Sequence, residues 1–109
     1  MKKYNKLVRD KIVSDLKKKG LKPKYHRAGK VEKLEKLFEK FNEEIEEFFK
    51  ARKKSDKEEE LADVREVMYA IYLALVEHYK LDKKIVKSIQ RKKAREKGRF
   101  EKNIILDEA

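Results

Sequence analysis

The sequence predicts an all-α protein, with four helices in a bundle-like arrangement around a central antiparallel helical hairpin, completed by oligomerisation. Two observations lead to this fold class. Apolar residues recur at helical spacing in every long segment, and strand-type alternation is almost absent. Residues 67–76 are uncharged and apolar on every side of a helix, so they need burial in the core or against a second subunit. A chain of 109 residues suits a single domain, residues 1–109.

The N-terminal third is expected to contain one helix followed by a loop. The helix should run from about Lys6 to Lys19, with Asn5 as its N-cap and Gly20 as its stop. Residues 21–30 contain the only proline and predict a loop, with a short extended piece near residues 24–26.

The hairpin is expected from the next two helices. The first covers about residues 31–52, and residues 53–56 make the turn. The second starts near Asp56, because Ser55 and Glu58 have capping-box spacing. The apolar stripes that should pack together are Leu34, Leu37, Phe38, Phe41, Ile45 and Phe48 on one helix, and Leu61, Val64, Val67, Met68, Ile71 and Leu75 on the other.

A fourth helix is expected between Asp82, as its cap, and Gly98. Its apolar residues, Ile85, Val86 and Ile89, should face inward. The tail over residues 100–106 ends in two isoleucines and a leucine, and we expect it to dock on the body of the protein.

The charge of the chain is strongly basic and unevenly distributed. The formal net charge is +11, with net charges of +10 over residues 1–33, −4 over residues 34–67 and +5 over residues 68–109. Nucleic-acid binding is one interpretation. A lysine-rich surface that keeps the protein soluble is another. The layout fits a third better: basic ends neutralise the phosphates of a substrate whose metal ion is bound by the acidic middle.

Several function classes are excluded by composition. The chain has no cysteine, which rules out disulfides and thiolate chemistry. The N-terminus has no apolar stretch typical of a signal peptide, and the ten-residue uncharged run is too short for a bilayer span. We therefore expect a soluble cytoplasmic protein without a membrane partner.

Two pairs of carboxylates are the strongest chemical signal. Glu44 with Glu47, and Glu60 with Asp63, are each three residues apart and so share a helix face. With the turn centred near residue 54, the rise per residue places Glu47 level with Glu60, and Glu44 with Asp63. Four carboxylates without a histidine at ligand spacing favour Mg²⁺, with Mn²⁺ as a substitute. The alternative from spacing alone is a solvated acidic face in a chain with 21 acids.

The acidic residues also resemble a known family signature. Glu43-Glu44-x-x-Glu47 followed by Glu60-x-x-Asp63 resembles the all-α nucleoside triphosphate pyrophosphohydrolases, which include the MazG-like and phosphoribosyl-ATP pyrophosphohydrolase-like proteins. Residues 4–12 and 93–102 resemble the N-terminal motif and the C-terminal basic motif of a small phosphoribosyl-ATP pyrophosphohydrolase-like subgroup. The matches cover nearly the whole chain in the expected order.

This resemblance implies a MazG-type fold and a site. Glu44, Glu47, Glu60 and Asp63 would bind Mg²⁺, with Glu43 as an outer ligand or base. The implied reaction cleaves a nucleotide between its α and β phosphates and releases pyrophosphate. The role stays open between nucleotide-pool housecleaning, which the resemblance to the subgroup favours, and a biosynthetic step. The implied assembly is a homodimer or homotetramer. The residues expected to bind the phosphates are Lys6, Arg9, Lys11, Lys93 and Lys97.

Differences from the subgroup leave the substrate open. Val13 stands where proline is usual, Arg65 where an apolar residue is common, and Lys97 and Arg99 replace an arginine and a glycine. The competing function is a small basic helical module that binds nucleic acid without catalysis. Against it, no helix-turn-helix pattern is present, and the acidic motifs would repel phosphates without a metal. A third interpretation is an antitoxin-like interaction protein with a degenerate site.

Overall fold

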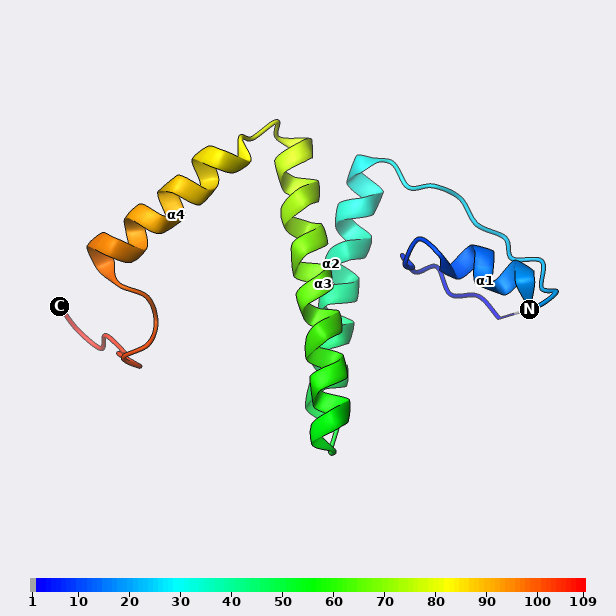
Figure 1. The fold of residues 1–109 in the computed structure, drawn as a ribbon, viewed down its shortest axis with the longest axis horizontal. Coiled ribbons are helices and arrows are strands. Elements are labelled where there is room, and N and C mark those ends of the chain that lie inside the picture. The colour runs from blue at the N-terminus through cyan, green and yellow to red at the C-terminus, as the bar shows by residue number, and fades with distance from the viewer. Residues whose placement is uncertain (1) are drawn as a thin grey trace.

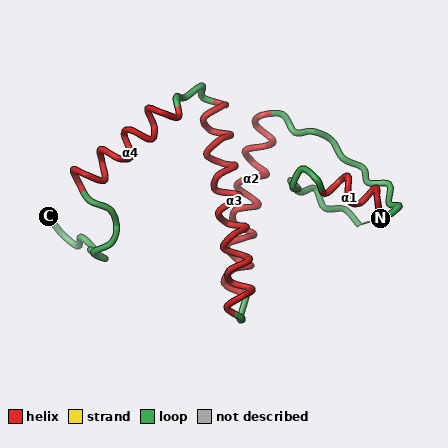
Figure 2. Tube along the Cα trace, viewed as in Figure 1, coloured by secondary structure: helices red, strands yellow, loops and turns green. Residues whose placement is uncertain are grey.

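The computed structural model describes residues 2–109, and these residues form helices and loops without a strand (Figures 1 and 2). The helices are α1 (Ile12–Lys18), α2 (Lys30–Lys50), α3 (Lys54–His78) and α4 (Lys83–Lys97). The all-α, four-helix prediction is confirmed. None of these helices combines the length and apolar character needed to cross a bilayer.

Helices α2 and α3 form the predicted antiparallel hairpin and contain the core (Figure 1). Leu37 on α2 is packed against the α3 residues Val67 and Ala74, and these three side chains are buried. The partly buried residues around them are Leu7, Leu34, Phe41, Ala70 and Ile71. The apolar stripes predicted for the two helices therefore meet as expected near their middles. Other predicted stripe residues, such as Phe38 and Met68, are about half exposed.

The turn of the hairpin lies earlier than the sequence suggested. Helix α3 begins at Lys54 with Lys53 as its N-cap, and no side chain caps it, so the predicted Ser55 capping box is wrong. The Nζ of Lys57 instead donates a hydrogen bond to the Phe48 carbonyl at 3.0 Å, across the hairpin. The same ammonium lies 4.7 Å from the centre of the Phe48 ring. These contacts join the two helices close to the turn, whose centre is near residue 52.

The first helix is shorter than predicted. Residues 2–9, here called the N-terminal arm, are not helical, and Asn5 has a φ of 49°, so it does not cap a helix. The arm is instead attached to the hairpin, because Leu7 packs on the core and two arm cations pair with hairpin carboxylates. These tertiary contacts override the local helix propensity.

The C-terminal end of α1 is as predicted. Gly20 has a φ of 83°, its N–H donates to the Lys17 carbonyl at 3.0 Å, and the Leu21 N–H donates to the Leu16 carbonyl at 3.1 Å. This pair of bonds is a Schellman motif, which needs a left-handed residue at the Gly20 position.

Helix α4 leaves the hairpin and extends away from it (Figure 1). Its predicted cap is confirmed, since the Asp82 carboxylate accepts from the Lys84 and Ile85 N–H groups at 2.8 and 3.4 Å. The predicted inward face is wrong for this chain on its own, because Ile85 and Ile89 are about half exposed. The predicted docking of the tail is also wrong, since Ile104, Ile105 and Leu106 are largely exposed. The connection after α3, with a φ of 53° at Lys80, directs α4 away from the core.

The chain is more extended than its length requires. Its radius of gyration is 18.4 Å, whereas a compact domain of this length has about 13 Å. Its accessible surface is 10675 Å², whereas a folded monomer of this mass exposes about 6,400 Å². Much of the apolar surface of α3, α4 and the tail is therefore not covered by the chain itself.

Candidate metal and active site

Three carboxylates from the two hairpin helices form one cluster. Oxygen atoms of Glu44 on α2 and of Glu60 and Asp63 on α3 all lie within 4.8 Å of one another. With the turn centred near residue 52, Glu44 and Glu60 are each about 12 Å along their helices from it, so they lie level. Asp63 follows Glu60 by about one helical turn and faces the same way.

Glu47 lies outside this group of three. The sequence predicted Glu47 beside Glu60, but the structure places Glu44 there, and Glu47 is exposed. The prediction failed because it centred the turn two residues too late, which shifted the register of one helix against the other. The predicted proximity of Glu44 to Asp63 survives this shift, since a Glu44 oxygen lies within 4.8 Å of oxygens of both α3 carboxylates.

Glu60 is the most perturbed member of the cluster. Its Oε2 atom is buried and has no hydrogen-bond partner. Burial raises the pKa of Glu60, and the adjacent Glu44 and the negative charges of Asp63 and Glu47 raise it further. A carboxylate oxygen in this setting needs either a proton or a cation. The donor set consists of hard oxygen atoms and fits a divalent ion such as Mg²⁺ or Mn²⁺.

Two cations of the N-terminal arm lie against these acids. Lys6 Nζ pairs with Glu43 at 2.9 Å, and Arg9 Nη2 pairs with Asp63 Oδ1 at 2.9 Å. The hydrogen bond from Lys6 lowers the pKa of Glu43, and the same bond raises the pKa of Lys6. The structure thus brings two of the predicted phosphate-binding residues to the edge of the acidic cluster.

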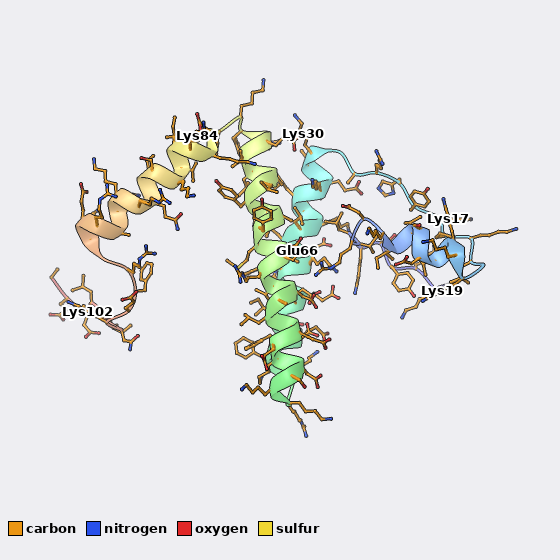
Figure 3. The ribbon with its side chains drawn as sticks, in the orientation of Figure 1. Lys17, Lys19, Lys30, Glu66, Lys84 and Lys102 are labelled. Carbon is orange, nitrogen blue, oxygen red and sulfur yellow. The ribbon has the colours of Figure 1, made fainter. Side chains whose placement is uncertain are left out.

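The other predicted phosphate-binding residues do not join them within one chain. Lys11 is the exposed residue that precedes α1. Lys93 and Lys97 are exposed on α4, which lies on the opposite side of the hairpin from α1 (Figure 1). Figure 3 shows the same separation for Lys17 on α1 and Lys84 on α4.

A groove beside the cluster was not predicted from the sequence. It has a volume of about 150 Å³ and runs between the N-terminal arm and α2. The groove exists because the arm is not helical. The helical periodicity of residues 6–19 predicted a helix there instead. The signal that could have indicated it is Asn5, because asparagine is among the few residues that tolerate a left-handed backbone. The groove is lined by Tyr4, Asn5, Lys6, Leu7, Lys36, Glu39, Lys40 and Glu43.

Comparison with known proteins identifies the family of the chain. The family model described as phosphoribosyl-ATP pyrophosphohydrolase matches residues 3–93, which include the arm from residue 3 onward, the hairpin and the whole acidic cluster. No curated protein and no solved structure matches the chain. Members of the matched family are metal-dependent hydrolases of acid anhydrides that act on nucleotides, and the match confirms the family resemblance of the N-terminal and acidic motifs. Nearly all of the C-terminal basic motif lies beyond the matched residues, and its resemblance stays a prediction. The chain belongs to the phosphoribosyl-ATP pyrophosphohydrolase family.

Proposed function

We propose that the protein is a Mg²⁺-dependent pyrophosphohydrolase that cleaves a nucleoside triphosphate, or a phosphoribosyl-ATP-like compound, between the α and β phosphates. One observation supports this most: Glu44, Glu60 and Asp63 converge in a chain of this family, and one Glu60 oxygen is buried without a partner. Mn²⁺ would substitute for Mg²⁺. The proposed setting is the cytoplasm, and the proposed role is removal of unwanted nucleotides from the pool.

The acids have two roles in this proposal, metal binding and activation of water. Glu44, Glu60 and Asp63 would hold the ion, and Glu47, one helical turn from Glu44, would be a further ligand. A bound ion would polarise the phosphate oxygens and offset the charge that develops on them. The hydrogen bond from Lys6 lowers the pKa of Glu43, so this carboxylate is ionised and suited to serve as an outer ligand. It would accept a proton from the attacking water once Lys6 has turned to a substrate phosphate.

The basic residues bind the phosphate chain. Lys6 and Arg9 already lie at the cluster, each paired with a carboxylate at 2.9 Å. Substrate phosphates and the metal would exchange partners with these pairs, so that arm cations contact phosphate while carboxylates contact the ion. Lys11 would approach from the start of α1, and Lys93 and Lys97 from α4 of a second copy.

We propose a homodimer or homotetramer as the working form. The accessible surface exceeds that of a compact monomer by roughly 4,000 Å², an area on the scale of obligate interfaces. Leu61, Met68 and Tyr69 on α3 are each more than half exposed. Leu61 directly follows Glu60, so a subunit that covers this surface would also lie beside the acidic cluster.

The test of the enzyme is pyrophosphate release from a panel of nucleoside triphosphates and phosphoribosyl-ATP, with Mg²⁺ and with a chelator. Glu60→Gln keeps the shape of the side chain and removes the charge. Glu66→Gln, at an exposed position of the same helix, is the matched control. We expect release only with the metal, loss in Glu60→Gln and wild-type release in Glu66→Gln. Equal release with a chelator, or from Glu60→Gln, would contradict the proposal.

One observation favours the nucleic-acid-binding alternative. On one side of α4, Lys84, Lys87, Arg91 and Arg95 line a shallow hollow of about 370 Å³ together with Ser88. Such a row of cations could follow a phosphate backbone. This function would show as binding to duplex DNA that needs no Mg²⁺ and weakens steeply with salt.

A further inference from the structure

The groove between the N-terminal arm and α2 lies next to the acidic cluster. Glu43 lies on its wall, and Glu44, the next residue, belongs to the cluster. The arm passes along the groove at residues 4–7 and reaches Asp63 with Arg9. A ligand in this groove would therefore be next to the groups proposed to bind phosphates and metal.

Each charged residue of the groove is already paired with another charged side chain. Lys6 pairs with Glu43 at 2.9 Å, and Lys36 pairs with Glu39 at 3.2 Å. Lys40 is 3.8 Å from a carboxylate oxygen of the acidic cluster. The walls are thus close to electrically balanced, and they suit a neutral ligand with polar edges better than a free polyanion.

Two neutral polar residues that line the groove, Tyr4 and Asn5, have the chemistry for such a ligand. Tyr4 is 62% exposed and offers an aromatic ring, with the Lys2 ammonium 5.1 Å from the ring centre. The Asn5 side chain has an amide with two donor hydrogens and an acceptor oxygen. Asn5 is held at a φ of 49° between Tyr4 and the anchored residues Lys6 and Leu7. An aromatic face and an amide are what proteins use to stack on a base and to hydrogen-bond its edge.

We propose that this groove is the nucleobase-binding subsite of the active site. The base stacks on Tyr4 and is hydrogen-bonded by Asn5, while the phosphates extend toward Arg9 and the acidic cluster. Tyr4 and Arg9 are five residue steps apart in the chain, which is at most about 18 Å when fully extended, a separation on the scale of one extended nucleotide. This inference rests on the proposed function for the substrate class, and it adds the residues that select the base.

The experiment measures binding of nucleoside monophosphates by calorimetry in EDTA. The probes are the four ribonucleoside 5′-monophosphates, and ribose 5-phosphate is the base-free reference. The variants are Tyr4→Ala, Tyr4→Phe and Asn5→Gly, of which the last tolerates the left-handed backbone and lacks the amide. Tyr25→Ala is the matched control, because Tyr25 is similarly exposed and also has a lysine ammonium near its ring, outside the groove.

We expect at least one monophosphate to bind about 5- to 150-fold more tightly than ribose 5-phosphate, the range for stacking one base on an aromatic ring. Tyr4→Ala should abolish this preference and Asn5→Gly should reduce it, while Tyr4→Phe and Tyr25→Ala retain it. The proposal is overturned when no monophosphate binds more tightly than ribose 5-phosphate, or when the preference survives in Tyr4→Ala.

This measurement is independent of catalysis, because a monophosphate has no anhydride bond and EDTA removes the metal. Base preference in a protein that releases no pyrophosphate would support the subsite and contradict the proposed function. Pyrophosphate release at the same KM for every base and for inorganic tripolyphosphate would do the reverse.

Discussion

Replacing Glu60 by glutamine should raise the stability of the metal-free protein and remove its stabilisation by Mg²⁺. Glutamine keeps the size of the side chain and cannot ionise. In the wild type, burial first, and then Glu44 and the charges of Asp63 and Glu47, raise the pKa of Glu60 above its ordinary value of 4.5. The folded protein therefore holds the Glu60 proton more tightly than the unfolded chain does.

The sign of the pH dependence follows from this difference. Where the folded state binds more protons, stability falls as pH rises. The metal-free wild type should lose stability as pH increases from the ordinary carboxyl pKa through the raised pKa of Glu60. The glutamine of Glu60→Gln does not ionise, so this position causes no loss of stability as pH rises. Near neutral pH the metal-free variant should therefore unfold at a higher temperature than the wild type.

Mg²⁺ should stabilise the wild type more than it stabilises Glu60→Gln. Mg²⁺ at ten times its dissociation constant should stabilise the folded wild type by about 1.4 kcal/mol. For a domain of this size, that corresponds to a rise of about 5–10 °C in Tm. Glu60→Gln should show little or no rise, and the Glu66→Gln control should behave as the wild type.

The assay is thermal unfolding followed by circular dichroism, at fixed protein concentration, with EDTA and with Mg²⁺. One result would refute the reasoning directly: Glu60→Gln unfolds at a lower temperature than the wild type in EDTA and still gains the full shift with Mg²⁺. That outcome would mean that Glu60 is a structural carboxylate and the ion is bound elsewhere.

Three further predictions concern stability and electrostatics. Lys80→Gly should stabilise the protein by about 0.5–1 kcal/mol, because the lysine has a φ of 53° at the end of α3; a lower Tm would contradict this. Asp82→Ala should destabilise the protein by about 1 kcal/mol, since the Asp82 carboxylate caps α4. Denaturant unfolding should show a lower midpoint concentration, and an unchanged midpoint would contradict the prediction. Lys6→Gln should raise the pKa of Glu43 toward 4.5 by removing its hydrogen bond, which a carboxyl-detected NMR titration measures. The stability that this pair contributes is present above the ordinary carboxyl pKa and disappears as pH falls through the lowered pKa of Glu43, so the variant should lose that part of the acid sensitivity. An unchanged pKa of Glu43 in Lys6→Gln would show that the pair does not form in solution.

The helices could be predicted because their signals are local. The apolar stripes gave α2 and α3, Gly20 gave the end of α1, and Asp82 gave the start of α4. The carboxylates of the cluster were identified for the same reason, since spacing of three residues on a helix is visible in the sequence.

The parts that could not be predicted depend on contacts between distant residues. The N-terminal arm is held by Lys6, Leu7 and Arg9 against the hairpin, and nothing within residues 6–19 records those partners. The register of Glu44 and Glu60 depends on a turn whose capping-box signal was false. The outward direction of α4 follows from the backbone near Lys80, a lysine in a conformation that sequence patterns assign to glycine.

The most direct test of the central claim is to identify the products from a nucleoside triphosphate by phosphorus NMR in the presence of Mg²⁺. Cleavage at the acidic hairpin between the α and β phosphates predicts one pyrophosphate and one nucleoside monophosphate for each substrate consumed, with neither product formed by Glu60→Gln. Orthophosphate with nucleoside diphosphate, or the predicted products at the same rate from Glu60→Gln, would contradict the account.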